Sequence, residues 1–234
     1  EDDYDSEFRM RGRPIPPLFM QDAQGSVIYM NTFTRSLGSV FRIAYMVLPP
    51  QLLTTFNERF TARACMVGAL EQLELARFIT SGDYERHVNR QRTAYRRLQD
   101  SLVTKITASE AGDYVRFKGV GSGLHFLMEV DLPAGTGSAT PFENASLERG
   151  IRLVNIETYR SASPSHSAKD RRTMDPRALD PATMSSPSDV TLHPHATDPC
   201  ATYVMNVSGL DSERIDEIAA TLSGALLTSI SACS

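Results

Sequence analysis

The most regular pattern of apolar and polar positions lies in the middle of the chain. Mostly apolar residues recur there at alternating spacings of three and four, at Tyr84, Val88, Gln91, Tyr95, Leu98, Leu102 and Ile106. This spacing lines one side of an α-helix, and it predicts a long amphipathic helix over roughly 83–108. Five arginines of the same segment lie mainly off this stripe: Arg86, Arg90, Arg92, Arg96 and Arg97. Because no base-stacking aromatics accompany them, we interpret them as a solvated face rather than as a nucleic-acid patch.

Shorter patterns predict the remaining elements. We expect strands at 26–30, 41–48, 114–118, 124–130, 151–156 and 202–208, and helices at 51–60, 67–80, 141–150 and from about 211 to 230. The run 41–48 is nearly all apolar, which is typical of a strand buried on both faces. Asp211 is the expected N-cap of the last helix, with Glu213 in its first turn. The order predicts an α/β fold in which the end of a mostly parallel sheet precedes a smaller α+β domain.

Residues 161–200 differ in character from the rest. They carry six prolines and many Ser, Thr and Asp residues, so we expect a disordered or loosely packed insertion. Four metal-ligand residue types fall at its end, at His193, His195, Asp198 and Cys200. A proline-rich loop offers no supporting shell of side chains to orient them, and we predict no metal site.

Composition narrows the class of protein. The chain has 234 residues, of which 41% are hydrophobic, and a formal charge of −4. This excludes a disordered tail and a disulfide scaffold, and mild acidity argues against a free-standing nucleic-acid binder. Three widely spaced cysteines favour a reducing cytoplasm, and no apolar run reaches membrane-spanning length. Because the chain starts at Glu1 without a methionine, we expect a piece of a longer polypeptide or a processed product.

Three short sequence stretches are uninformative one by one, but their order and spacing together are typical of one family of proteins. Residues 1–8 have the sequence Glu-Asp-Asp-Tyr-Asp-Ser-Glu-Phe, 29–37 have Tyr-Met-Asn-Thr-Phe-Thr-Arg-Ser-Leu, and 42–49 have Arg-Ile-Ala-Tyr-Met-Val-Leu-Pro. This order and spacing resemble the aminotransferase-like domain of the MocR/PdxR regulators, a branch of the GntR transcription factors. More broadly they resemble fold type I enzymes that use pyridoxal phosphate (PLP). The resemblance covers about 1–160 and 201–230, and it includes Gly123-Leu124-His125.

The resemblance implies an architecture and partners. Residues 1–80 would be the C-terminal portion of the PLP-binding large domain, and 81–234 would be an interdomain helix and a small domain containing the insertion 161–200. It implies a cytoplasmic homodimer that reaches DNA only through a separate N-terminal domain absent from this chain. The ligand would be a small amino-acid-like or PLP-like molecule, and no membrane partner is implied.

The resemblance also assigns roles to single residues. Asp2 would pair with the pyridine nitrogen of PLP, which keeps the ring protonated as an electron sink. Tyr4 would hydrogen-bond the ring hydroxyl. Thr32, Thr34 and Arg42 would hold the phosphate, because hydroxyls supply donors and a guanidinium matches phosphate in geometry and charge. For Arg42 alone, a buried structural ion pair is the alternative.

One departure from the family pattern bears directly on function. The residue after Thr32-Phe33-Thr34 is the family's Schiff-base lysine, and here it is Arg35. A Schiff base needs an amine lone pair, which a guanidinium does not offer because it is delocalised and remains protonated. The chain has three lysines, Lys105, Lys118 and Lys169, and none has the sequence context to substitute. We therefore expect no covalent PLP attachment and no transaminase activity, with non-covalent PLP binding still open.

A second departure concerns the substrate. The family's substrate-carboxylate arginine lies on the strand before the last helix, which is 203–208 here and contains no arginine. Alignment puts Val204 near that place, and Arg152 and Arg160 are candidate replacements without further support.

Three functions remain open from the sequence. The first is a catalytically degenerate, ligand-sensing effector domain of a MocR-like regulator. The second is the C-terminal half of a PLP-dependent class I/II aminotransferase with an unusual site. The third is a decayed fragment that persists as a packing or dimerisation module.

Overall fold

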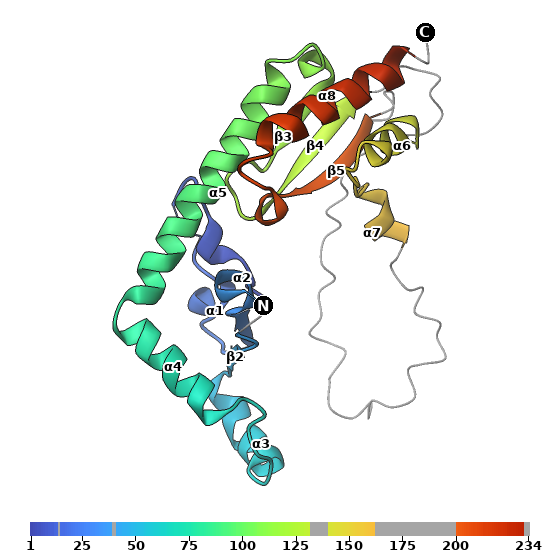
Figure 1. The fold of residues 1–234 in the computed structure, drawn as a ribbon. Coiled ribbons are helices and arrows are strands. Elements are labelled where there is room, and N and C mark those ends of the chain that lie inside the picture. The colour runs from blue at the N-terminus through green and yellow to red at the C-terminus, as the bar shows by residue number, and fades with distance from the viewer. Residues whose placement is uncertain (14, 39–40, 132–139, 162–199, 232–234) are drawn as a thin grey trace.

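The computed structural model describes residues 1–13, 15–38, 41–131, 140–161 and 200–231. Its elements in chain order are η1 (Ser6–Phe8), α1 (Leu18–Gln21), β1 (Tyr29–Thr32), α2 (Thr34–Leu37), β2 (Ala44–Val47), α3 (Pro50–Phe60), α4 (Ala69–Thr80), α5 (Asp83–Thr107), η2 (Gly112–Tyr114), β3 (Val115–Lys118), β4 (His125–Asp131), α6 (Thr140–Glu148), α7 (Glu157–Ser161), β5 (Cys200–Asn206), η6 (Val207–Gly209) and α8 (Ile215–Ser231). Figure 1 shows the long helix α5 with the sheet β3–β5 at one end, α3 and α4 beyond the other, and the N-terminal elements beside its middle. The predicted mixed α/β character is confirmed.

The sheet at the C-terminal end of α5 is antiparallel, with strand order β3-β4-β5. Alternate residues of β4 are buried, so that Phe126, Met128 and Val130 face the core and their neighbours do not. This period of two is what a strand with one covered face requires. The covering layer consists of α8, which lies across the sheet and packs against both α5 and α6 (Figure 1).

The main hydrophobic core lies between this sheet and its helices. Leu102 and Ile106 enter it from α5, and Leu222 and Leu226 enter it from α8, each at most 2% exposed. Burial of a leucine or isoleucine side chain contributes roughly 1.5–3 kcal/mol. This core fixes the end of α5, and through α5 it fixes the position of the N-terminal elements.

The N-terminal sheet is small and open. Strands β1 and β2 pair antiparallel, with Tyr29 opposite Val47. Among the described residues, parallel pairing is confined to a bridge between Asp2 and Met30. All four residues of β2 are exposed. The prediction of a strand buried on both faces is therefore wrong for β2. Tyr45 has ring contacts with Tyr29 and Phe33, but in the described part of the chain no packed layer buries any of the four residues.

Two further sequence expectations need correction. Residues 151–156 form no strand, although the Val154 carbonyl accepts from Val204 N–H at 2.9 Å and Ile156 N–H donates to the Thr202 carbonyl at 2.8 Å. The segment turns into α7 directly afterwards, so it forms only an isolated bridge beside β5. Helix α8 begins at Ile215, and the Asp211 carboxylate instead closes a turn before it by accepting from Glu213 N–H at 2.9 Å.

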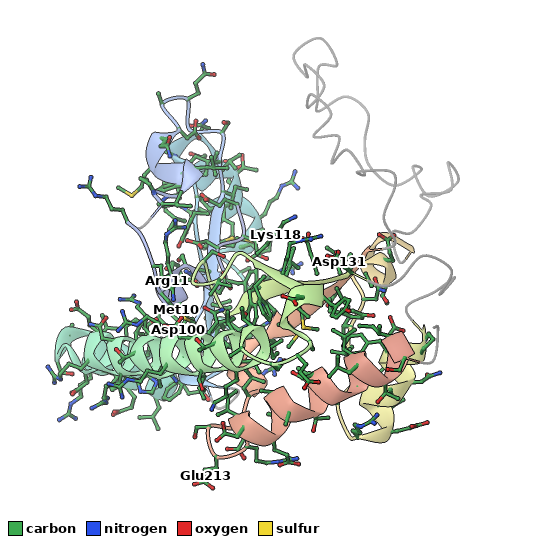
Figure 2. The ribbon with its side chains drawn as sticks, turned by 90° about the horizontal axis from the view of Figure 1, so that it is seen from above. Met10, Arg11, Asp100, Lys118, Asp131 and Glu213 are labelled. Atoms are coloured by element: carbon green, nitrogen blue, oxygen red, sulfur yellow. The ribbon has the colours of Figure 1, made fainter. Side chains whose placement is uncertain are left out.

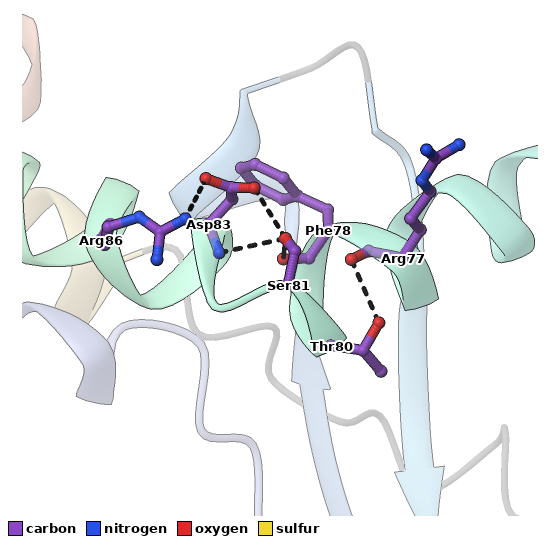
Figure 3. Close-up of polar contacts among 6 residues, drawn as sticks. All are labelled: Arg77, Phe78, Thr80, Ser81, Asp83 and Arg86. Atoms are coloured by element: carbon purple, nitrogen blue, oxygen red, sulfur yellow. Dashed lines mark hydrogen bonds and ion pairs between the residues drawn. The ribbon is translucent and has the colours of Figure 1, made fainter.

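The long helix matches its prediction closely. The stripe predicted helix over 83–108, and α5 spans Asp83–Thr107 with Val88, Leu102 and Ile106 buried. It begins after Gly82, which adopts a left-handed conformation with φ of 75°. Figure 3 shows how the first turn is fixed: Ser81 Oγ donates to Asp83 at 2.7 Å, and Arg86 donates to the other carboxylate oxygen at 2.5 Å.

Glycine-to-alanine changes at two places should have opposite effects. Gly82→Ala forces a Cβ into the left-handed region, and we expect a loss of about 1–2 kcal/mol in the free energy of unfolding. Gly224→Ala lies inside α8, where an added Cβ meets nothing within 4 Å. There we expect a gain of about 0.5–1 kcal/mol from helix propensity. Urea denaturation of both variants tests this, and destabilisation at Gly224 would contradict it.

Some expectations fall outside the described residues. These include the insertion at 162–199, Lys169 and the histidines at 193 and 195. Within the described ranges, no group of three or more His, Cys, Asp or Glu residues could hold a metal ion. No helix of the described part has both the length and the apolarity to cross a membrane.

Candidate functional site

The site begins at the first residues of the chain. Residues 1–3 run parallel to β1: Met30 N–H donates to the Glu1 carbonyl at 2.9 Å, and Asp3 N–H donates to the Met30 carbonyl at 2.9 Å. Between them, Asp2 bridges to Met30 and carries an exposed side chain. The segment is anchored by Phe8, which is fully buried and packs edge-on against Tyr95 of α5 at 5.5 Å between ring centroids.

Arg35 and Tyr4 are brought into direct contact. Arg35 lies on the short helix α2, which follows β1, and its guanidinium carbon lies 5.4 Å from the centroid of the Tyr4 ring. This is the geometry of a cation–π interaction, for which the range at exposed sites is about 0.5–1 kcal/mol. The residue at the expected lysine position therefore lies beside the tyrosine expected to contact the cofactor ring.

Charges near Tyr4 affect its ionisation. Burial and the carboxylate of Asp5 raise the pKa of Tyr4, and the charge of Asp2 acts in the same direction. The guanidinium of Arg35 opposes these effects. The Tyr4 hydroxyl consequently stays protonated at neutral pH and can donate a hydrogen bond.

The two threonines are adjacent and partly satisfied by the protein. Thr32 Oγ1 lies 3.0 Å from Thr34 Oγ1 and accepts from Thr34 N–H at 3.2 Å. Thr34 Oγ1 also reaches the Phe41 carbonyl at 3.4 Å, which brings the segment before β2 against the start of α2. Arg42 follows Phe41 in this segment, with an exposed side chain. Arg42 is in no ion pair in the described part of the chain, so the structure does not support the buried-ion-pair alternative.

His125 is a neighbour of the site that sequence reasoning did not select. Its ring lies 6.4 Å from that of Tyr4, and its buried Nδ1 lies 4.0 Å from the Asp5 carboxylate without a hydrogen-bond partner. Gly123, two residues earlier, allows this approach, since a Cβ there would lie 2.9 Å from Asp5 Oδ2. The Gly-Leu-His motif was the signal available in the sequence.

The opposite side of the first strand carries a separate polar network. Tyr29 donates to Asp3 at 2.9 Å, and the amide nitrogen of the buried Asn31 donates to Tyr29 at 3.1 Å and to Glu7 at 3.4 Å. Burial raises the pKa of Glu7. A cavity of about 510 Å³ lies on this side, lined by Asp3, Glu7, Tyr29 and Arg92 among others. None of the six predicted site residues lines it.

The structure locates the residues considered for the substrate carboxylate. Val204 lies in β5 opposite Leu127 of β4. Arg152 is exposed in the segment before α7, and Arg160 lies within α7. A substrate-carboxylate role for either arginine stays a prediction.

Solved structures define the class of the fold. The aromatic aminotransferase Aro9 from Candida albicans matches with a TM-score of 0.71 and 14% identity, over 99% of this chain and 48% of that one. The α-aminoadipate aminotransferase LysN from Thermus thermophilus matches with a TM-score of 0.67 and 19% identity, over 99% of this chain and 50% of that one. The chain therefore has the fold of the fold type I PLP-dependent transferases, of which it spans about half.

Sequence relatives narrow the class. The regulator YdeL of Bacillus subtilis is 43% identical over 58% of this chain and 29% of its own length. The regulators MocR of Rhizobium meliloti and PdxR of Corynebacterium glutamicum are 42% and 29% identical, over 44% and 68% of this chain and 21% and 33% of their own. No family model matches. The chain is therefore similar in sequence to a part of these transcription regulators, and it spans a third or less of the length of each.

Pyridoxal phosphate is the cofactor of this family, and when bound it supplies an electron sink. The side chains described above fit a phosphorylated pyridine by their chemistry. Asp2 offers an exposed carboxylate for a ring nitrogen, and Arg35 and Arg42 offer exposed guanidinium donors for a phosphate or ring oxygen. The hydroxyls of Thr32 and Thr34 add polar atoms beside them.

Proposed function

We propose that this chain is part of a ligand-sensing, catalytically degenerate aminotransferase-like domain of a MocR-type transcription regulator. Asp2, Tyr4, Thr32, Thr34, Arg35 and Arg42 would hold PLP or a PLP-like ligand without covalent attachment. The large-domain portion would be 1–80 and the small-domain portion 81–234, in a cytoplasmic homodimer that contacts its operator through a separate domain.

The observation that carries this proposal is Arg35 over the Tyr4 ring. A guanidinium stays protonated at any pH a cell reaches, so it cannot act as the amine of a covalent linkage. The two described lysines do not offer a substitute. Lys105 is ion-paired with Asp216, and Lys118 is ion-paired with Glu129 at 2.6 Å. Both ion pairs lie on the sheet β3–β5 and the helices packed against it. The hydrogen-bond donors near Tyr4 support binding of a phosphorylated ring. Neither of these described lysines offers an amine near Tyr4, which supports loss of transaminase activity.

Titration with PLP tests the proposal. We expect saturable binding to the complete polypeptide encoded by the gene, followed by recovery of the unmodified protein mass after borohydride treatment, since no imine is present to be reduced. Arg42→Ala should weaken binding on the order of tenfold, equivalent to about 1.4 kcal/mol. The matched control is Arg59→Ala, an exposed arginine on α3 that should bind as the parent does.

Three results would contradict the proposal in different ways. Absence of saturable binding would remove the ligand-sensing function. A borohydride-trapped adduct on the unmodified sequence would remove the non-covalent mode. Transfer of an amino group from an amino acid to a keto acid would show that the domain is an aminotransferase.

A further inference from the structure

The outer side of α5 carries an unusually dense positive charge. From 86 to 97 the sequence contains five arginines and no aspartate or glutamate, in a chain whose formal charge is −4. The structure shows that this stretch is exposed along the side turned away from Val88 and Leu102, the positions that pack inward.

Two of the five arginines are engaged in hydrogen bonds or ion pairs within the protein. Arg86 pairs with Asp83 at 2.5 Å. Arg92 donates from Nε to the Glu7 carbonyl at 2.9 Å and from Nη1 to Asn89 at 2.8 Å, so it fastens the N-terminal segment to α5. Another exposed arginine nearby, Arg11, is paired with Asp100 (Figure 2).

The remaining three, Arg90, Arg96 and Arg97, form what we call the α5 arginine face. All three are exposed, and none is in an ion pair with any residue that the structure describes. Arg90 and Arg97 are seven residues apart, which places them on one side of the helix about 10 Å apart along its axis. They border a shallow hollow of about 440 Å³ together with Asn89, Thr93 and Ala94.

We propose that the α5 arginine face binds the sugar–phosphate backbone of duplex DNA. The sequence alone favoured a solvated face because base-stacking aromatics are missing, but contacts to the phosphate backbone do not require them. Guanidinium groups match phosphate oxygens in charge and in planar geometry, and contacts to phosphates are the commonest contacts that proteins make with DNA. Phosphates on one strand repeat every ~3.4 Å of duplex axis, so a ~10 Å row of arginines can reach more than one. Duplex DNA is the proposed occupant because its phosphates carry the charge opposite to this face, and because the relative YdeL is an HTH-type transcriptional regulator. The inference rests on the regulator part of the proposed function and not on ligand binding.

Fluorescence anisotropy with a mixed-sequence duplex, measured over a range of NaCl concentrations, tests the proposal. For the full chain we expect log affinity to fall linearly with log salt. The triple variant R90A/R96A/R97A should bind more weakly, with a slope reduced by roughly 0.9 for each arginine that touches a phosphate. Alanine is a strong helix former, so α5 should persist, as circular dichroism can confirm.

The matched control removes the same charge elsewhere. Arg59, Arg77 and Arg152 are exposed and lie outside α5, and R59A/R77A/R152A should retain most of the salt slope. Equal loss in both triple variants would overturn the proposal, because it would show a general charge effect. No salt-dependent binding by the parent, or tighter binding of single-stranded RNA of the same length, would overturn it as well. PLP titration of the same proteins separates this outcome from failure of the ligand site.

Discussion

Arg35→Lys should convert reversible PLP binding into covalent binding. A lysine at this position restores an amine close to Tyr4 and the other expected ligand-binding residues. In the complete polypeptide encoded by the gene, we expect a visible absorbance band on PLP addition and a borohydride-stable mass increase located at residue 35. The expected effect is qualitative, from no adduct to a trapped adduct.

Two comparisons make the Arg35→Lys experiment decisive. Arg35→Gln also removes the guanidinium but has no amine, so it should give no adduct. Lysine introduced at Arg59 on α3 adds the same side chain away from Tyr4 and should give no site-specific adduct there. A folded Arg35→Lys protein that binds PLP without any adduct would show that the residues around Tyr4 do not hold the ring near position 35. A folded variant that does not bind PLP would favour the view that the region is a decayed packing module.

Leu102→Ala should be the most destabilising of the substitutions proposed for this protein. Leu102 is fully buried in α5, within the main core between the sheet and α8. Truncation removes transfer free energy and leaves a cavity, for which the usual loss is about 2–5 kcal/mol. We expect that loss in the free energy of unfolding, measured by urea denaturation.

The same substitution at Leu70 provides the control. Leu70 lies on α4 and is 72% exposed, and alanine is at least as good a helix former. We expect a change within about 0.5 kcal/mol. Comparable losses at both positions would contradict the assignment of the core, because burial would then not determine the cost.

The sequence predicted those helices and strands whose local pattern of apolar residues is sufficient to determine them. The three-four spacing of apolar residues predicted α5, and the short patterns at 114–118 and 124–130 predicted the two strands that pair as β3 and β4. For β2, the apolar run indicated burial, but burial depends on what packs against the strand. The exposure of Tyr45 and Met46, at 42% and 47%, is a tertiary property that no local pattern encodes.

The candidate site was predictable through motif order rather than through any single residue. The spacing of the three clusters identified Asp2, Tyr4 and Arg35, and the structure places the last two in contact. It did not identify His125, because a histidine in a strand carries no signal by itself. Its approach to Tyr4 depends on β4 passing the N-terminal segment, a long-range contact beside which Gly123 leaves room for the Asp5 carboxylate.

The open strand β2 also has a practical consequence for work on this protein. In the described part of the chain it pairs only with β1, so its other edge presents free backbone groups beside exposed Tyr45, Met46 and Val47. Such an edge is a template for intermolecular strand pairing, and short apolar strands without charge are the usual nuclei of aggregation. Aggregation should therefore increase with protein concentration, and a lysine introduced on this edge should reduce it.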